Sequence, residues 1–282
     1  MHKIRIKNQK GNVMDARWAV GFIMVGVTGI TLATGRAEER IEELKSELTL
    51  DVFSSYTSRG QVNNDRPVVQ PTLNLSKYGI IAEVWGNYNV TDRVGDKPNF
   101  SEVDLTLGYT LPVEGVDMQV GIIDYEFPNT TVAQAAENET LSAVYLRPAP
   151  STREVYWKGA LPNAIVTPGL EVYYDFDQAH GFYCVASLER ECGLCDRLTL
   201  TPGCSSAWAS SGYNDYFFGV RRNALNDGNV FLNSQYSITQ ALKAGASFCY
   251  TWLWDTDIRD GADGIYMDTH KLWGGVTVEF EF

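Results

Sequence analysis

The last twelve residues, KLWGGVTVEFEF (271–282), alternate between apolar and polar side chains, and this pattern limits the possible folds. One face carries Leu272, Val276, Val278, Phe280 and Phe282, and the other carries Lys271, Trp273, Thr277, Glu279 and Glu281. A period of two indicates a strand with one apolar and one polar face. In a soluble sheet the apolar face meets a core, whereas in an outer-membrane barrel it meets lipid and the polar face meets a watery lumen.

The same alternation recurs along most of the chain. Twelve segments carry it, namely residues 48–60, 68–76, 80–90, 101–111, 116–127, 153–161, 170–177, 181–189, 197–208, 229–238, 242–254 and 271–282. Two further runs, 140–148 and 213–222, either extend neighbouring strands or raise the count to fourteen. A phase slip at Ile122 and Ile123 predicts a β-bulge. The 15 tyrosines, 12 phenylalanines, 7 tryptophans and 25 glycines suit strands and turns.

The connections between these segments alternate in length. Residues 77–79, 112–116 and 239–241 are short, whereas 61–67, 91–99, 128–144, 210–228 and 255–270 are longer and more polar. Two mid-length turns, 163–168 and 189–197, fall on the short side. Short periplasmic turns and long outer loops are typical of membrane barrels, and a soluble sandwich has no reason to sort its loops. The sequence therefore predicts an all-β, antiparallel transmembrane β-barrel of about 12 strands, with 14 possible.

The N-terminus has the features of an export signal. Basic residues lie within 3–17, an uncharged apolar run fills 18–33, and small residues precede Glu38. This order is typical of a cleaved signal peptide, and the run is shorter than the roughly 20 residues of a spanning helix. We expect a signal peptide at 1–37, a short periplasmic helix or disordered lead-in at 38–47, and the barrel at 48–282.

Several segments strengthen the barrel interpretation through a resemblance. EVYWKGAL (154–161), LEVYYDFD (170–177), YNDYFFGV (213–220) and LWGGVTVEFEF (272–282) resemble those of a poorly characterised porin-like family of Gram-negative outer-membrane β-barrel proteins. The resemblance implies the cell outer membrane, reached through the periplasm, with outer-membrane lipid and lipopolysaccharide as surroundings. It also implies that Phe282, with Phe280 and Val278, is an assembly signal for the barrel assembly machinery. It carries over no catalytic residue and leaves the oligomeric state open.

The polar faces of the predicted strands supply the candidate functional residues. The candidates expected to face the lumen are Asp51, Arg59, Glu83, Glu102, Asp104, Lys158, Glu171, Asp175, Lys243, Glu279 and Glu281. Rings of carboxylates favour cations in a pore, although any water-filled lumen needs polar side chains. We expect a narrow channel for small solutes or ions with cation preference. The alternatives are a closed structural or adhesive barrel and an outer-membrane hydrolase.

Other motifs point to no catalysis. No G-x-S-x-G elbow accompanies the histidines of the exported part, His180 and His270, so we expect no enzyme. The C-x-x-C of Cys192 and Cys195 is either a small disulfide or two free thiols in a turn. The aspartate-rich loop 255–268 departs from the EF-hand pattern and is either a solvated loop or a loose site for divalent ions. We expect no cofactor, no dedicated metal site and, at a net charge of −12, no nucleic acid.

Overall fold

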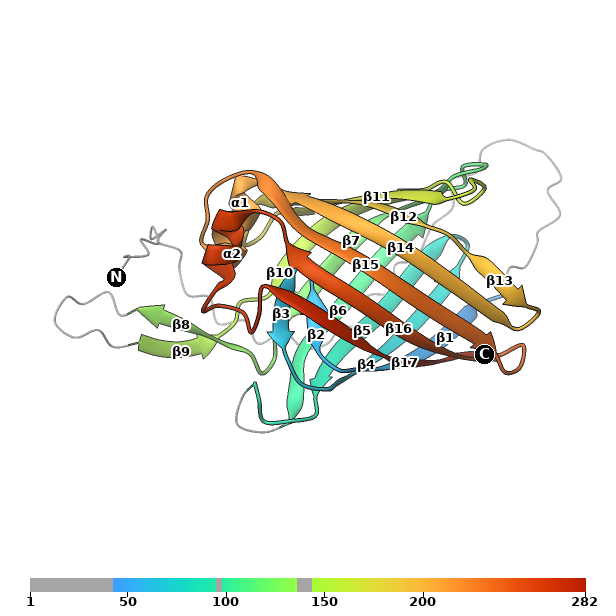
Figure 1. The fold of residues 1–282 in the computed structure, drawn as a ribbon, viewed down its shortest axis with the longest axis horizontal. Coiled ribbons are helices and arrows are strands. Elements are labelled where there is room, and N and C mark those ends of the chain that lie inside the picture. Colours follow the sequence, from blue (N-terminus) through green and yellow to red (C-terminus); the bar gives the residue numbers. More distant parts are fainter. Residues whose placement is uncertain (1–42, 95–97, 136–143) are drawn as a thin grey trace, which may run out of the picture. The chain divides into compact units, whose positions relative to one another are not determined.

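The computed structural model describes residues 43–94, 98–135 and 144–282, and its main sheet closes into an antiparallel barrel (Figure 1). The sheet has thirteen strands, of which β13 (Cys192–Cys195) only extends the edge of β14, so twelve strands form the wall. These are β1 (Lys45–Phe53), β4 (Val68–Lys77), β5 (Ile80–Asn89), β6 (Asn99–Thr110), β7 (Asp117–Glu126), β10 (Thr152–Ala160), β11 (Thr167–Asp175), β12 (Gly181–Glu189), β14 (Leu198–Ala209), β15 (Ala224–Ser237), β16 (Leu242–Leu253) and β17 (His270–Glu281). The predicted all-β barrel of twelve strands is confirmed.

Two strand pairings complete the ring, one between the first and last strands and one across the short strand β13. β1 pairs with β17 from Glu47↔Glu281 to Phe53↔Gly275, which joins the first strand to the last. β12 pairs with β14 from Tyr183↔Ala209 to Glu189↔Gly203, and β13 lies beyond that contact. Closure leaves the wall with no free edge, which is the condition for a sheet to stand in lipid.

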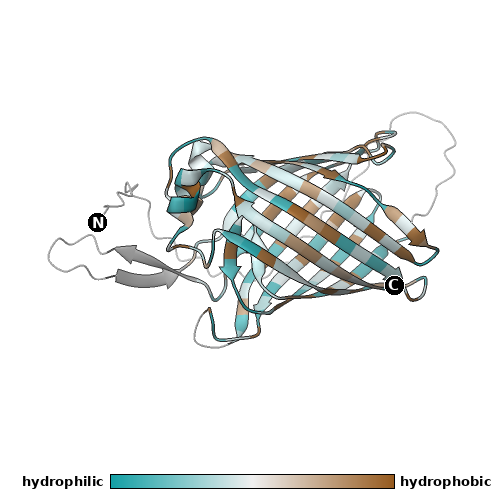
Figure 2. Cartoon of the chain, viewed as in Figure 1, coloured by the Kyte–Doolittle hydropathy of each residue, from teal (hydrophilic) through white to brown (hydrophobic). Residues whose placement is uncertain are grey.

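The outer face of the barrel is apolar. Leu48, Leu50 and Val52 of β1 are 41–47% exposed, and Val276, Val278 and Phe280 of β17 are 45–55% exposed. Figure 2 shows hydrophobic residues alternating with more polar ones along the wall strands. So large an exposed apolar surface would aggregate in water and is stable against lipid. None of the helices in the described residues combines the length and the apolar character needed to cross a membrane.

The remaining elements lie in the connections. At the end of the barrel with the longer loops, the β1–β4 connection contains the hairpin β2 (Tyr56–Ser58) and β3 (Gln61–Asn64), and the β7–β10 connection contains β8 (Thr131–Ala135) and β9 (Val144–Pro148). Helices α1 (Ser211–Phe218) and α2 (Thr256–Ala262) follow β14 and β16 at the same end (Figure 1). We call this the long-loop end and the opposite one the short-turn end.

The structure corrects several expected boundaries. Residues 48–60 are not one strand, because β1 ends at Phe53 and the chain then turns into the β2–β3 hairpin. β1 also starts at Lys45, inside the expected lead-in, and the signal peptide and the rest of the lead-in to residue 42 lie outside the described residues. The run 213–222 is largely helix α1, and β9 pairs only with β8, so neither adds a wall strand.

The predicted bulge at Ile122 and Ile123 is wrong. β7 keeps an unbroken register with β6 and with β10, and Ile123 is 9% exposed because it faces inward. The break in the apolar–polar alternation is therefore caused by an apolar residue, Ile123, on the inner face of the strand. Irregularities in the wall occur instead at Asn87/Tyr88 and at Ser206/Trp208.

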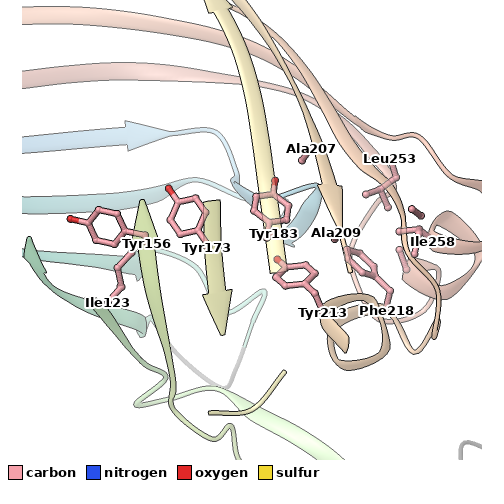
Figure 3. Close-up of a cluster of buried hydrophobic side chains, with 12 residues drawn as sticks. Ile123, Tyr156, Tyr173, Tyr183, Ala207, Ala209, Tyr213, Phe218, Leu253 and Ile258 are labelled. Atoms are coloured by element: carbon pink, nitrogen blue, oxygen red, sulfur yellow. The ribbon is translucent and has the colours of Figure 1, made fainter. Parts of the chain in front are cut away.

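Buried apolar side chains gather inside the barrel, toward the long-loop end. A row of tyrosines, Tyr156, Tyr173 and Tyr183, continues to Tyr213 of α1 (Figure 3). A second group of Phe218, Leu253, Ile258 and Ala262 packs where α1 and α2 meet β16. Side chains therefore fill part of the long-loop half of the barrel, whereas a wide porin would leave it open.

Candidate functional site inside the barrel

The β2–β3 hairpin places Arg59 among the inward-facing side chains of the wall. Arg59 and Gly60 form its two-residue turn, with φ of 49° and 76°. Two positive φ values are the pattern of the tight hairpin turn, which favours glycine. A Cβ on Gly60 would lie 2.5 Å from Cδ2 of Leu253, so glycine also lets the tip lie against β16.

The guanidinium of Arg59 binds the carboxylate of Glu154 on β10 through both oxygens. Nη1 donates to Oε1 and Nη2 donates to Oε2, each at 2.7 Å. Nη2 also donates to the Tyr125 hydroxyl at 3.1 Å, and that hydroxyl donates to Glu154 Oε2 at 2.8 Å. The Glu154 side chain is 2% exposed and that of Arg59 is 18% exposed. Two parallel charge-assisted hydrogen bonds in a dry setting fix both position and orientation.

Aromatic rings surround the same guanidinium. Its Cζ lies 4.5 Å from the ring centroid of Tyr173 and 4.7 Å from that of Tyr183, with Tyr125 at 5.9 Å and Tyr213 at 6.0 Å. These distances fall within the range of cation–π attraction. We call Glu154, Tyr125, Tyr173, Tyr183 and Tyr213 the arginine cage.

The wall register explains how the cage forms. Tyr156 is paired with Tyr173 across β10 and β11, and Tyr173 is paired with Tyr183 across β11 and β12. The three rings therefore form one row across the inner face, visible in Figure 3. Tyr183 donates to Asp227 Oδ1 at 2.7 Å, which holds its ring at the end of the row.

Polar side chains fasten the hairpin to the opposite wall. Asn64 donates to Asn89 at 2.7 Å, and Asn87 donates to Ser101 at 2.8 Å. These buried amides form a connected network, and such networks specify one arrangement when all members are satisfied. Tyr56 at the start of the hairpin donates to Glu102 Oε2 at 2.5 Å.

One cavity lies beside the hairpin, and a second cavity adjoins it and shares a part of its lining. One of about 280 Å³ is lined by residues that include Arg59, Tyr125 and Glu102, and one of about 160 Å³ by residues that include Glu83 and Lys158. Trp85, Asp104 and Ile123 line both. Asp104 Oδ1 is buried without a hydrogen-bond partner. The space next to the hairpin therefore carries acidic side chains, Glu102 and Asp104, that form no ion pair with Arg59.

A third cavity of about 290 Å³ lies between β14, β15, β16 and β17. Lys243 of β16 donates to Glu279 at 2.6 Å and to Glu281 at 2.8 Å. Oxygens of Glu47, Glu279 and Glu281 lie within 4.8 Å of one another. The ammonium of Lys243 therefore balances part of this carboxylate group.

The other sequence candidates lie along the same inner face. Asp51 accepts a hydrogen bond from Thr277, Lys158 Nζ lies 4.0 Å from Glu171 Oε2, and Asp175 accepts from Thr152 at 2.6 Å. Arg59 differs from the rest because it lies on the hairpin and not on a wall strand.

The three residues of the expected assembly signal lie on the lipid side of the closing strand. Val278 and Phe280 of β17 are paired with Leu50 and Leu48 of β1. Phe282 follows the strand, its ring centroid is 5.8 Å from that of Phe280, and its backbone N–H donates to Ser46 O at 3.0 Å.

The remaining motifs take structural roles. The five cysteines are unbonded to one another, so Cys192 and Cys195 are free thiols at the short-turn end. Asp255 caps α2 by accepting from Asp257 N at 2.9 Å, and Arg222 pairs with both aspartates. The aspartate-rich loop is therefore a capped helix joined to the β14–β15 connection.

The five cage residues were absent from the sequence candidates. Glu154 lies in the alternating segment 153–161, of which only Lys158 is predicted from the sequence to face the lumen. The tyrosines enter that prediction only as part of the aromatic composition. The register of β10, β11 and β12 could have revealed the tyrosines of the cage, because it pairs Tyr156 with Tyr173 and Tyr173 with Tyr183.

The closed strand ring, the apolar exterior and the polar interior define an outer-membrane β-barrel protein, and the outer membrane is its location. The chain belongs to the Gcw_chp family, described as bacterial proteins of unknown function, whose sequence profile matches residues 44–241.

Comparison with curated proteins gives one match over part of the chain. The chain is 30% identical over 84 residues to a 24 kDa outer membrane protein of Pasteurella multocida (strain Pm70), a stretch that covers 25% of this chain and 33% of that protein. The match therefore spans about a third of the length of the relative.

Two solved structures show the extent of the similarity in fold. An outer membrane channel from Pseudomonas putida F1 is 8% identical, with 89% of this chain and 100% of that chain covered at a TM-score of 0.48. The NanC porin is 12% identical, with 83% and 98% covered at a TM-score of 0.44.

Proposed function

We propose that this barrel is a narrow outer-membrane channel that passes small cations and small solutes beside the β2–β3 hairpin. The observation that supports this most is the pair of adjoining cavities whose shared lining includes Asp104, with Glu102 and Glu83 nearby. Carboxylates in a narrow low-dielectric passage raise the local cation concentration and repel anions.

The hairpin supports a small conducting path. It occupies the long-loop half of the lumen, where the arginine cage and the Asn64–Asn89 contact hold it. The cavity of about 280 Å³ beside it and the adjoining cavity of about 160 Å³ suit hydrated ions and compact solutes. Arg59 contributes little to anion selection in this arrangement because Glu154 neutralises it.

Reversal potential in a planar bilayer tests the proposal. The refolded protein in a salt gradient should give small steps with a reversal potential on the cation side. Asp104→Asn together with Glu102→Gln should move that potential toward zero. Glu114→Gln, in the exposed β6–β7 turn, is the matched control and should change nothing. Anion preference in the unmodified protein would contradict the proposal.

A closed structural barrel is the second candidate, and the buried hairpin favours it. The arginine cage and the amide network give the β2–β3 hairpin many satisfied polar contacts, as expected of a hairpin that stays in the lumen permanently. Silent bilayers with correctly folded protein, judged by a heat-dependent shift in gel mobility, would support this candidate over the channel.

A further inference from the structure

The arginine cage is a complete recognition site for a planar cation. Glu154 offers both oxygens at 2.7 Å to the two amino groups of the fork, and the rings of Tyr173 and Tyr183 lie 4.5 Å and 4.7 Å from its central carbon. A carboxylate that matches the fork, together with aromatic rings, selects guanidinium over ammonium.

The residues of the cage all lie outside the hairpin. Its members come from β7, β10, β11, β12 and α1, all of them wall strands or the helix that follows β14. Tyr183 is held by Asp227, and the tyrosines contact one another along the row. From the hairpin, Gln61 donates to the Tyr213 hydroxyl at 3.4 Å, and Arg59 places its guanidinium inside the cage. Arg59 is therefore comparable to a ligand that is covalently tethered to the protein.

A solute can reach this site. The cavity of about 280 Å³ is lined by Arg59, Tyr125 and Tyr173, so it extends to the edge of the cage. The Arg59 side chain is 18% exposed, and Glu102 and Asp104 line the same cavity. A cation that enters the cavity therefore meets carboxylates first and the cage next.

We propose that the arginine cage is a binding site for solutes that carry a guanidinium group, and that Arg59 is a built-in competitor which those solutes displace. Displacement frees the hairpin tip and enlarges the lumen. The binding part stands on the cage alone, whereas the enlargement of a conducting path rests on the proposed channel function.

The tether sets the concentration scale. A short flexible link gives its end an effective concentration in the millimolar range. The amide contact of Asn64 restrains the hairpin, so this range is a lower limit for the concentration at which a free solute competes with Arg59. Removing the side chain removes the competitor. Arg59→Ala should therefore bind guanidinium compounds at concentrations at least tenfold lower than the unmodified protein does.

Binding to the refolded full-length barrel in detergent micelles provides the test. Methylguanidinium should bind Arg59→Ala in isothermal titration calorimetry, and both methylammonium and neutral methylurea should bind at least tenfold more weakly. Glu154→Gln in the Arg59→Ala background should lower methylguanidinium affinity at least tenfold. Arg59→Met, which keeps the cage filled without charge, should not bind. Equal binding of all three probes, or none to a folded Arg59→Ala barrel, overturns the proposal.

Hydrogen exchange of the unmodified protein covers the case in which Arg59→Ala does not fold. Millimolar methylguanidinium should speed amide exchange in β2 and β3 several-fold, while methylammonium at equal ionic strength should not. Unchanged exchange up to 100-fold above the tether's effective concentration, about 1 mM, overturns displacement. Failure of the proposed function is a separate result, since silent bilayers leave calorimetry and exchange unaffected.

Discussion

Two neighbouring residues of β15 test which face of the wall meets lipid. Leu232 points outward and is 42% exposed, whereas Asn233 points inward and lines the cavity of about 290 Å³ with Glu189 and Glu279. Lysine at each position introduces the same side chain at nearly the same depth in the membrane. Only Leu232→Lys would place its ammonium on the lipid side.

The position of Leu232 along the strand sets the size of the effect. β15 runs from Ala224 to Ser237, so its midpoint falls between residues 230 and 231. At about 3.4 Å per residue and a tilt of about 40°, Leu232 lies roughly 4 Å from that level, well inside an apolar band about 25 Å tall. A lysine near the midplane costs about 2–4 kcal/mol.

Urea unfolding of the barrel in phospholipid vesicles, followed by tryptophan fluorescence, measures the difference. Leu232→Lys should lower the free energy of unfolding by about 3 kcal/mol, a factor of about 150 in the folding equilibrium, from the midplane value for lysine. Asn233→Lys should stay within about 0.5 kcal/mol of the unmodified protein, as polar sites in water do. Leu232→Met controls for the loss of leucine shape. An equal or larger cost for Asn233→Lys would show that the inward and outward faces are reversed.

Two further changes test the hairpin and the short-turn end. Gly60→Ala should release the hairpin tip, because its Cβ would lie 2.5 Å from Leu253 Cδ2, and hydrogen exchange of the β3 amides should become faster. Gly115→Ala is the control, because Gly115 has a similar φ of 78° and a Cβ there would meet no atom within 4 Å. It measures the cost of the backbone dihedral alone and should leave exchange in β3 unchanged. Glu279→Gln should cost under about 1 kcal/mol, since Lys243 keeps Glu281 at 2.8 Å, and should make the reversal potential less cation-selective. A larger loss in urea unfolding would mean that Lys243 depends on Glu279 alone.

Alternation predicted the wall well because lipid and lumen impose opposite chemistry on neighbouring residues. Gly181–Glu189 was predicted to the residue, and the terminal strand differs only at its ends. The pattern failed where the inside of the barrel is not watery. Ile123 faces the filled half of the lumen, so an inward residue carries an apolar side chain and imitates a bulge.

The hairpin could not be predicted from periodicity. Residues 48–60 continue the alternation of β1 past Phe53, although the chain there leaves the wall. The pair Arg59 and Gly60 suits a tight turn, but a turn sequence does not say whether the loop folds into the lumen or away from it. That choice depends on Glu154 and the tyrosine row, which lie on strands about a hundred residues further along the chain.

In the proposed channel, the β2–β3 hairpin both narrows the lumen and carries the charge of Arg59. With Arg59 in the cage, Glu154 is neutralised, and the cation preference that we propose would depend on acidic side chains that the hairpin leaves unpaired, Asp104 first among them. If Arg59 withdraws with no guanidinium solute in its place, the Glu154 carboxylate is exposed to the lumen and a positive charge moves away from it. Both changes have the same sign, so in the proposed channel the open lumen with an empty cage should be more cation-selective than the closed one. Withdrawal of a hairpin that carried no charge would widen the passage without this change in selectivity.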